Sequence, residues 1–299
     1  MNYVIGGHTI CLNDRYLTKN TNPLTNFIPF LEKGDMGVKP LFAVHFWEKP
    51  DEQKDEATAD NINSCHFYAG EDLSCVLSHK SKEYRLKIQA GVNKTLLELT
   101  VENKLENAVC SITMNESVSD SLLSFLLMLV YGIAASRYDT LLLHASAIIV
   151  NGKGLLFLGE SGTGKSTHAA LWTKAFPESC LLNDDNPVVR IMDGIPLVYG
   201  SPWSGKTDCY KNEEVEIAAI IRLQQGNKNR IERLHGVDSL CALLPSCPSL
   251  FLYDDELASR TCMSLSGLLR HTPVYRLECL PDRSAPELVY NTLQKDLIF

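Results

Sequence analysis

One segment of nine residues, GESGTGKST at 159–167, constrains the fold of this 299-residue chain more than any other feature. An apolar run at 154–159 leads into it, and a segment with helical spacing at 168–176 follows it. The segment therefore predicts a glycine-rich connection from a buried strand to a helix. It satisfies the pattern GxxxxGK[ST], whose fixed positions are Gly159, Gly164, Lys165 and Ser166.

The residue types in this segment suit the binding of phosphate groups. Glycines permit backbone conformations that turn several N–H groups inward, and the first turn of the following helix presents its own unpaired N–H groups. Lys165 would neutralise the terminal phosphates, and the Ser166 hydroxyl would ligate Mg²⁺. We therefore expect a nucleoside triphosphate, taken as ATP with Mg²⁺; the alternative is a strand-to-helix turn that binds no ligand. The residues expected to bind it are Gly159, Glu160, Ser161, Gly162, Thr163, Gly164, Lys165, Ser166 and Thr167.

Hydrophobic patterning divides the chain near residue 116. Residues 1–116 contain short runs of strand length, which predict a β-rich N-terminal domain. In residues 117–299 strands alternate with helices, which predicts an α/β domain. The expected strands are 41–49, 64–70, 84–90, 95–101, 108–114, 141–150, 154–159, 180–184, 217–223, 229–234 and 273–280. The expected helices are 120–137, 168–176, 254–270 and 285–296.

Two segments have an unusual composition. Residues 122–135 are apolar all round, but they fall short of the ~20 residues that span a bilayer, so we expect a buried helix and no membrane association. Residues 48–60 are rich in acids and lack apolar periodicity, which predicts a solvated loop.

Two adjacent carboxylates, Asp184 and Asp185, follow the apolar run at 180–183. Functional groups gather at the carboxyl ends of strands in open α/β sheets. Phosphoryl transfer needs a metal ligand and a group that orients or deprotonates the attacking oxygen, and an acid pair can divide these tasks. The alternative is a polar turn, because NDDN is also favourable turn chemistry.

Three basic side chains are further candidates. His144 interrupts the run 141–150, where it is either a hydrogen-bonded core residue or a neighbour of the bound phosphate. His168, in the first turn of the expected helix, would reach phosphate or face solvent. Lys206 lies in GSPWSGKT at 200–207, whose small residues suggest close approach to another backbone or to the ligand. It would add a second positive charge at the site, unless the segment is a plain turn.

With these residues assembled, the region from about 140 to 234 resembles the HPr kinase/phosphorylase family, whose phosphate-loop fold is shared with phosphoenolpyruvate carboxykinase. The resemblance is carried by the glycine-rich segment, by a histidine fifteen residues before it and by the acid pair. It implies an α/β P-loop domain of that type, preceded here by the β-rich domain. By the resemblance, Asp184 is the general base, Asp185 supports the metal or the base, Ser166 ligates Mg²⁺, Lys165 clamps phosphate and His144 neighbours the reacting phosphate.

The function that follows from motif and resemblance together is an ATP-dependent kinase. It would transfer the γ-phosphate to a serine-like hydroxyl on a protein, a peptide or a small molecule. Two alternatives stay open: a carboxykinase-like enzyme, and a non-catalytic regulator that binds a nucleotide.

Composition narrows the partners and the compartment. The formal net charge of -8 and the pI near 5.5 disfavour nonspecific binding to nucleic acid. Ten scattered cysteines and an N-terminus without a signal-peptide pattern predict reduced thiols in a cytoplasmic protein. A homo-oligomer stays open.

Overall fold

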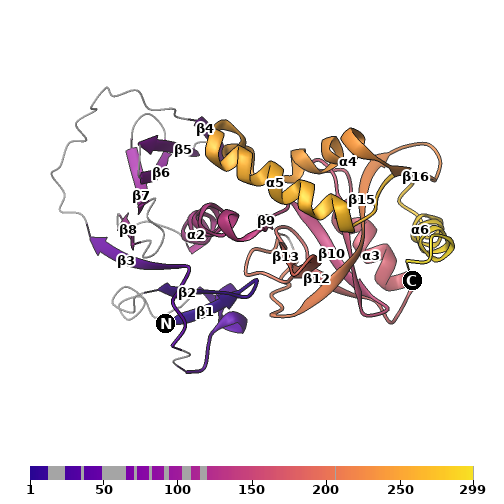
Figure 1. Ribbon diagram of the computed structural model, residues 1–299, viewed down its shortest axis with the longest axis horizontal. Coiled ribbons are helices and arrows are strands. Elements are labelled where there is room, and N and C mark those ends of the chain that lie inside the picture. Colours follow the sequence, from indigo (N-terminus) through magenta and orange to yellow (C-terminus); the bar gives the residue numbers. More distant parts are fainter. Residues whose placement is uncertain are drawn as a thin grey trace. The chain divides into compact units, whose positions relative to one another are not determined.

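The computed structural model describes residues 1–12, 24–34, 37–48, 65–70, 73–80, 83–90, 94–102, 109–114, 120–205 and 207–298. The chain forms two compact units (Figure 1). The first comprises Met1–Ala135 and Leu250–Ala258, and the second comprises Ser136–Ser249 and Ser259–Phe299.

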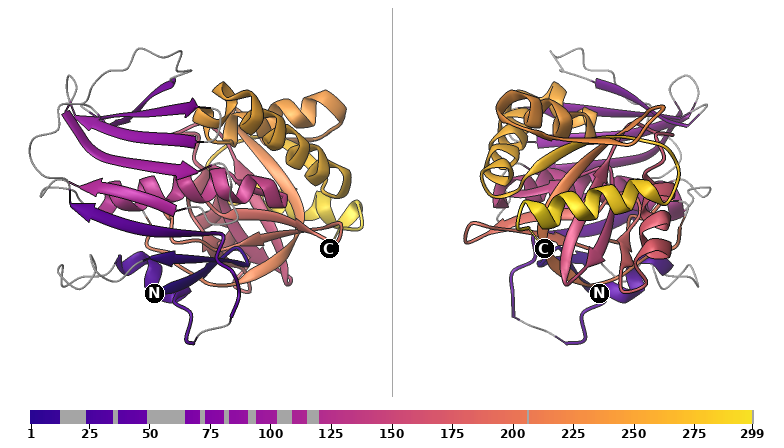
Figure 2. Two further views of the ribbon diagram at one scale, coloured as in Figure 1. Left: turned by 60° about the vertical axis from the view of Figure 1, so that its left-hand side comes forward. Right: turned by 90° about the vertical axis from the view of Figure 1, so that its right-hand side faces the viewer.

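The first unit is built on a sheet with eight strands among the described residues. The neighbours β8 to β4 pair antiparallel, whereas β3 pairs parallel with both β2 and β8 (Figure 2). The five strands predicted in this region are confirmed; β1, β2 and β5 were not predicted. In spatial order the strands are β1 (Asn2–Ile5), β2 (His8–Leu12), β3 (Phe42–Glu48), β8 (Val109–Met114), β7 (Lys94–Glu102), β6 (Glu83–Ala90), β5 (Leu73–Lys80) and β4 (Cys65–Gly70).

The predicted apolar helix is α2 (Asp120–Ala135), and it belongs to the first unit. The Tyr131 hydroxyl donates a 2.9 Å hydrogen bond to the Ile5 carbonyl, and Asn26 in the 3₁₀ helix η1 (Thr25–Phe30) donates one to Ser124. With the following 3₁₀ turn, η3 (Ser136–Tyr138), it is long and apolar enough to cross a membrane, and 72% of that stretch is buried. An apolar helix buried in a protein core has the same composition, so these properties are weak evidence for a membrane span.

The division into compact units falls after α2, whereas the predicted domain boundary lies before it, at residue 116. The hydrogen bonds of α2 explain this difference, because they join the helix to the start of the chain. That residues 1–116 and 117–299 are separate domains stays a prediction. The acidic segment 48–60 lies outside the described residues apart from Glu48.

The second unit is built on a mixed, curled sheet with nine strands among the described residues. The long strand β15 pairs antiparallel with β14 at its start and parallel with β11 and β17 farther on. Along the main path the strands are β12 (Cys180–Asn183), β10 (Ala145–Val150), β11 (Lys153–Leu158), β15 (Glu214–Gln225), β14 (Ile195–Tyr199), β13 (Val188–Met192) and β9 (Thr140–Leu142); β17 (Val274–Cys279) pairs with β15 and with β16 (Arg230–Leu234).

Helices pack on both faces of this sheet, which accounts for its continuous apolar strands. One core contains Trp172 of α3 (Lys165–Ala175) and Leu293 of α6 (Ser284–Lys295). The other core contains Leu243 of α4 (Gly236–Leu243) and Leu268 of α5 (Asp255–His271). Short 3₁₀ helices, η4 (Leu244–Ser246) and η5 (Ser249–Tyr253), connect α4 to α5.

The predicted strand 141–150 is wrong in one respect, because it is two strands rather than one. β9 ends at Leu142 and pairs with β13, whereas β10 begins at Ala145 and pairs antiparallel with both β11 and β12. His144 lies in the break between them. The other strands and helices predicted after residue 140 are confirmed; β13, β14 and α4 were not predicted.

Candidate functional site

Three strand ends of the second unit meet at one edge of its sheet. Ala145, the first residue of β10, is paired with Leu158, the last residue of β11. Near the same end of β10, Ala147 is paired with Asn183, the last residue of β12. Because β10 runs antiparallel to both neighbours, the glycine-rich loop, the acid pair and His144 all lie at this edge.

The glycine-rich loop connects β11 to α3 as predicted, and it needs glycine at defined positions. Gly162 has φ 82° and Gly164, the residue before α3, has φ 96°, a backbone region that other residues rarely adopt. A Cβ on Gly159 would overlap the Thr163 hydroxyl. Thr163 in turn donates from its backbone N–H and its hydroxyl to the Glu160 carbonyl, at 3.2 and 2.8 Å, which holds the loop in a tight turn.

Lys165 folds back over this loop instead of extending into solvent. Its side chain is buried, and Nζ donates to the carbonyls of Gly159 and Glu160 at 3.0 and 3.3 Å. Nζ also lies 2.9 Å from His144 Nε2.

Burial lowers the pKa of the Lys165 ammonium, and the positive charge of Arg222 acts in the same direction. The nearby carboxylates of Asp185 and Asp184 oppose this lowering of the pKa. Burial therefore disfavours the charged form of Lys165, and the two carboxylates favour it. A bound anion would stabilise the charged form further.

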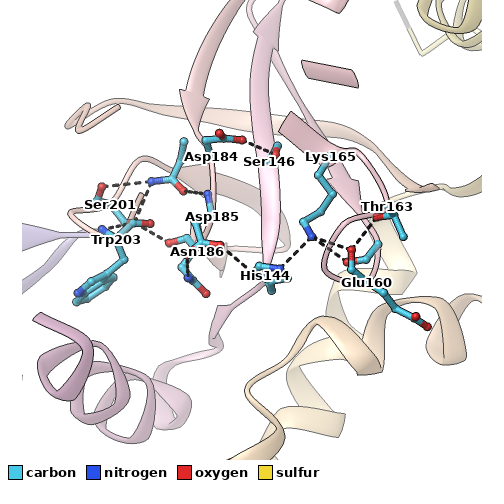
Figure 3. A network of polar contacts seen from close by, with 12 residues as sticks. His144, Ser146, Glu160, Thr163, Lys165, Asp184, Asp185, Asn186, Ser201 and Trp203 are labelled. Carbon is cyan, nitrogen blue, oxygen red and sulfur yellow. Dashed lines mark hydrogen bonds and ion pairs between the residues drawn. The ribbon is translucent and has the colours of Figure 1, made fainter. Parts of the chain in front are cut away.

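His144 joins the lysine to the acid pair (Figure 3). Its Nδ1 lies 3.0 Å from Asp185 Oδ1, while its Nε2 faces Lys165. A lysine ammonium has only donors, so Nε2 accepts and the Nδ1–H donates to the carboxylate; the neutral imidazole with its proton on Nδ1 satisfies both contacts. Its backbone N–H is fixed by the Ser246 carbonyl at 2.7 Å. The result is a continuous polar chain from lysine to carboxylate.

The two acids occupy different environments. Asp184 is only 5% exposed and accepts a 2.6 Å hydrogen bond from the Ser146 hydroxyl through Oδ1. The side chain of Asp185 is 33% exposed, and its second oxygen accepts from the Asn186 amide at 2.8 Å. The more exposed acid is the one connected to Lys165.

The segment 200–205 packs directly behind the acid pair. The Asn183 side-chain amide donates to the Ser201 carbonyl and hydroxyl, at 3.2 and 3.1 Å. Figure 3 shows Ser201 and Trp203 of this segment beside the acid pair. A Cβ on Gly205 would lie 3.1 Å from the Asp184 carbonyl oxygen and 3.3 Å from Asp185 Cβ. The predicted close approach to another backbone is confirmed, whereas Lys206 lies outside the described residues.

The predictions that His168 reaches phosphate or faces solvent are both wrong. It is 3% exposed, lies edge-on to Phe157 with ring centroids 4.7 Å apart, and accepts a hydrogen bond from Trp172 Nε1 at 3.2 Å. Burial lowers its pKa to about 4, so it is neutral near pH 7. His168 is a core residue, because the helix places it against the sheet.

Arg222 is a site neighbour that the sequence interpretation missed. It is the second-to-last residue of the predicted strand 217–223, and its register partner in β11 is Leu158, immediately before the glycine-rich loop. Beside it is a cavity of about 550 Å³, lined by loop residues 160–163, by the end of β15, by part of α4 and by Arg276. The one charged residue within the otherwise apolar run IAAIIRL was the available signal.

No protein-family model and no curated protein matches the sequence. Among solved structures, the chain is similar to the Hpr(Ser) kinase/phosphatase from Coxiella burnetii, with 15% sequence identity and a TM-score of 0.31. The match covers 52% of this chain and 88% of that one. This likeness is a distant structural relationship only.

Proposed function

We propose that the second unit binds ATP with Mg²⁺ on the glycine-rich loop and transfers the γ-phosphate to a serine-like hydroxyl. The observation that carries the proposal is the polar chain from Lys165 through His144 to Asp185. This chain joins the lysine of the glycine-rich loop to the acid pair at one edge of the sheet. Phosphoryl transfer requires a phosphate-binding group and such acids close together. Burying a lysine against the carbonyls of the loop costs free energy, and a glycine-rich turn that binds no ligand would not require it.

The described donors fit magnesium bound together with a nucleotide. Ser166 is exposed in the first turn of α3, and Asp185 is the more exposed acid. No group of three or more His, Cys, Asp or Glu side chains that could hold a metal occurs in the described part of the chain. Mg²⁺ commonly binds through one or two protein ligands together with phosphate oxygens and water, where it neutralises charge on the phosphates. Ser166 and Asp185 would be those one or two protein ligands.

The remaining roles follow from burial and hydrogen bonding. Lys165 would exchange its contacts with the loop carbonyls for contacts with phosphate oxygens. His144 would keep the Lys165 ammonium directed at the site. Asp184 would accept the proton of the attacking hydroxyl, and the hydrogen bond from Ser146 to its Oδ1 would hold the carboxylate in place. The acceptor is a hydroxyl on a protein, a peptide or a small molecule.

The test separates binding from transfer. Calorimetry measures Mg·ATP affinity, and labelled ATP with a panel of hydroxyl acceptors measures transfer. Lys165→Met should weaken binding about tenfold or more, because it removes a charge-assisted hydrogen bond to phosphate. Asp184→Asn should retain affinity within about threefold yet lose 10²- to 10⁴-fold in transfer, the usual contribution of a general base.

Lys174→Met is the matched control, because this lysine is exposed on the same helix. Its binding and transfer should equal those of the parent. If the folded parent shows no magnesium-dependent affinity for ATP, the proposed function is wrong. If Asp184→Asn transfers phosphate at the parental rate, Asp184 is not the base.

A further inference from the structure

Arg222 is a partly buried cation at the edge where the candidate site lies. Its side chain is 16% exposed, although arginine is seldom buried without a partner. Because β11 and β15 are parallel neighbours, its pairing with Leu158 places it beside the first residue of the glycine-rich loop.

The charge of Arg222 is poorly compensated. In the described residues the one carboxylate within ion-pair distance is that of Glu160, whose side chain is 83% exposed and whose oxygen lies 3.9 Å from Nη2. The other polar contact, with the Ser246 hydroxyl, is long at 3.4 Å. An exposed carboxylate at this distance contributes little, because solvent screens it.

A buried cation nearby, Lys165, makes the imbalance larger. Arg222 lies close enough to Lys165 for its charge to disfavour the lysine ammonium. Two positive charges close to one loop, one buried and one partly buried, repel each other, and an anion in contact with both would stabilise both.

The cavity beside the loop leaves room for an anion next to Arg222. Arg222 and the loop residues 160–163 line it together. Arg276, the other arginine of the cavity, is already paired with Glu232 at 2.8 Å. Of these two arginines, Arg222 is therefore the one whose pairing is weak enough for a ligand to replace.

We infer that Arg222 contacts the polyphosphate held by the glycine-rich loop, and that the Glu160 carboxylate stands in for a phosphate oxygen until the nucleotide binds. This inference rests on the proposed function. It assigns to Arg222 the second positive charge that the sequence interpretation assigned to Lys206. Binding displaces Glu160 from the guanidinium, because two anions cannot share it without repulsion.

The inference predicts opposite effects from the two partners. Arg222→Gln should weaken binding of a non-hydrolysable Mg·ATP analogue about tenfold or more, since one charge-assisted contact is lost. The affinity of Arg222→Lys should lie between those of the parent and Arg222→Gln, because a lysine keeps the positive charge but lacks the planar guanidinium. Glu160→Gln should tighten binding about two- to fivefold, since a competing anion is removed. All are measured by calorimetry on the full chain.

Arg230→Gln is the matched control, because Arg230 is exposed on β16 and its substitution removes the same unit of positive charge. Its affinity should stay within about twofold of the parent. In the double variant Glu160→Gln/Arg222→Gln the benefit of the Glu160 change should shrink, because the two side chains act on one phosphate group.

The inference fails if the parent binds the analogue and Arg222→Gln binds within about twofold of it; the proposed function would then still stand. It also fails if Glu160→Gln weakens binding. Should Arg222→Gln not fold, the comparison of Arg222→Lys and Glu160→Gln with the parent decides the matter. A folded parent that binds no nucleotide overturns both proposals.

Discussion

At the scale of single residues, two histidines with similar sequence surroundings have opposite roles. His144 has a side chain 42% exposed, with one nitrogen toward Lys165 and the other toward Asp185. His168 is enclosed by Phe157 and Trp172, which come from a strand and a helix that meet only in the fold. The sequence could identify His144 as a candidate site residue, because its strand is expected beside the one that leads into the glycine-rich loop. It could not exclude His168, because the apolar surroundings of a side chain are a tertiary property.

The buried His168 predicts how stability depends on pH. Its folded pKa of about 4 lies below the value of 6.5 in an unfolded chain. The unfolded state therefore binds the proton first as pH falls, and the free energy of unfolding decreases from pH 6.5 toward pH 4. At pH 5 the loss relative to pH 7 should be about 2 kcal/mol from this residue.

His168→Gln should remove this part of the pH dependence, because it keeps an acceptor for Trp172 but does not titrate. Urea unfolding followed by tryptophan fluorescence at pH 5 and 7 measures it, and His235→Gln, at an exposed position, is the control. An equal pH dependence in His168→Gln and the parent would contradict the assignment.

At the scale of elements, the order of strands and helices was predictable but the pairing was not. Apolar runs predicted most strands of the second unit, yet 141–150 was interpreted as one strand, although its two halves pair with different neighbours. The sequence does contain the signal for the antiparallel hairpin β10–β11. Asn151 and Gly152 form its two-residue turn with φ of 51° and 72°, and Asp193 and Gly194 do the same between β13 and β14. The antiparallel direction of β10 is what brings His144 to the loop.

These two turns give a prediction for the hairpins. Gly152→Ala and Gly194→Ala should each lower the free energy of unfolding by about 1 kcal/mol, because an L-residue is strained at positive φ. No atom within 4 Å opposes a Cβ at Gly152, so strain rather than a clash would be the cause. Asn151→Gly is the control and should change stability little. Alanine tolerated at Gly152 without loss would show that the turn adopts another conformation.

At the scale of the whole molecule, the chain enters the first unit twice. Residues 250–258 return to it after most strands of the second unit have been formed. In this returning segment Asp254 is buried and accepts hydrogen bonds from the Tyr84 hydroxyl at 3.2 Å and the Leu257 backbone N–H at 2.9 Å. It also lies 2.9 Å from His79 Nδ1. Local patterning could not predict this return, because it depends on contacts between residues about 170 positions apart.

Asp254→Ala should therefore destabilise the first unit by about 2 to 3 kcal/mol, since it removes the cap acceptor of the Leu257 N–H and the shorter of the two carboxylate contacts of the Tyr84 hydroxyl. Asp255→Ala is the matched control, because its neighbouring carboxylate is exposed and should matter little. Hydrogen exchange of β5 and β6 amides measures the loss in the first unit separately from the second. Equal protection in the two variants would contradict this role for Asp254.

The returning segment also determines the order of events on the ribosome. The N-terminal sheet is synthesised first, but it lacks Asp254 and its apolar neighbours until residue 258 has left the exit tunnel. By then strands β9 to β16 have already emerged and can begin to pair. The part of the protein that is translated first is therefore completed late: a nascent chain stopped before residue 250 would contain all eight strands of the N-terminal sheet but would lack the segment 250–258 that completes the first unit.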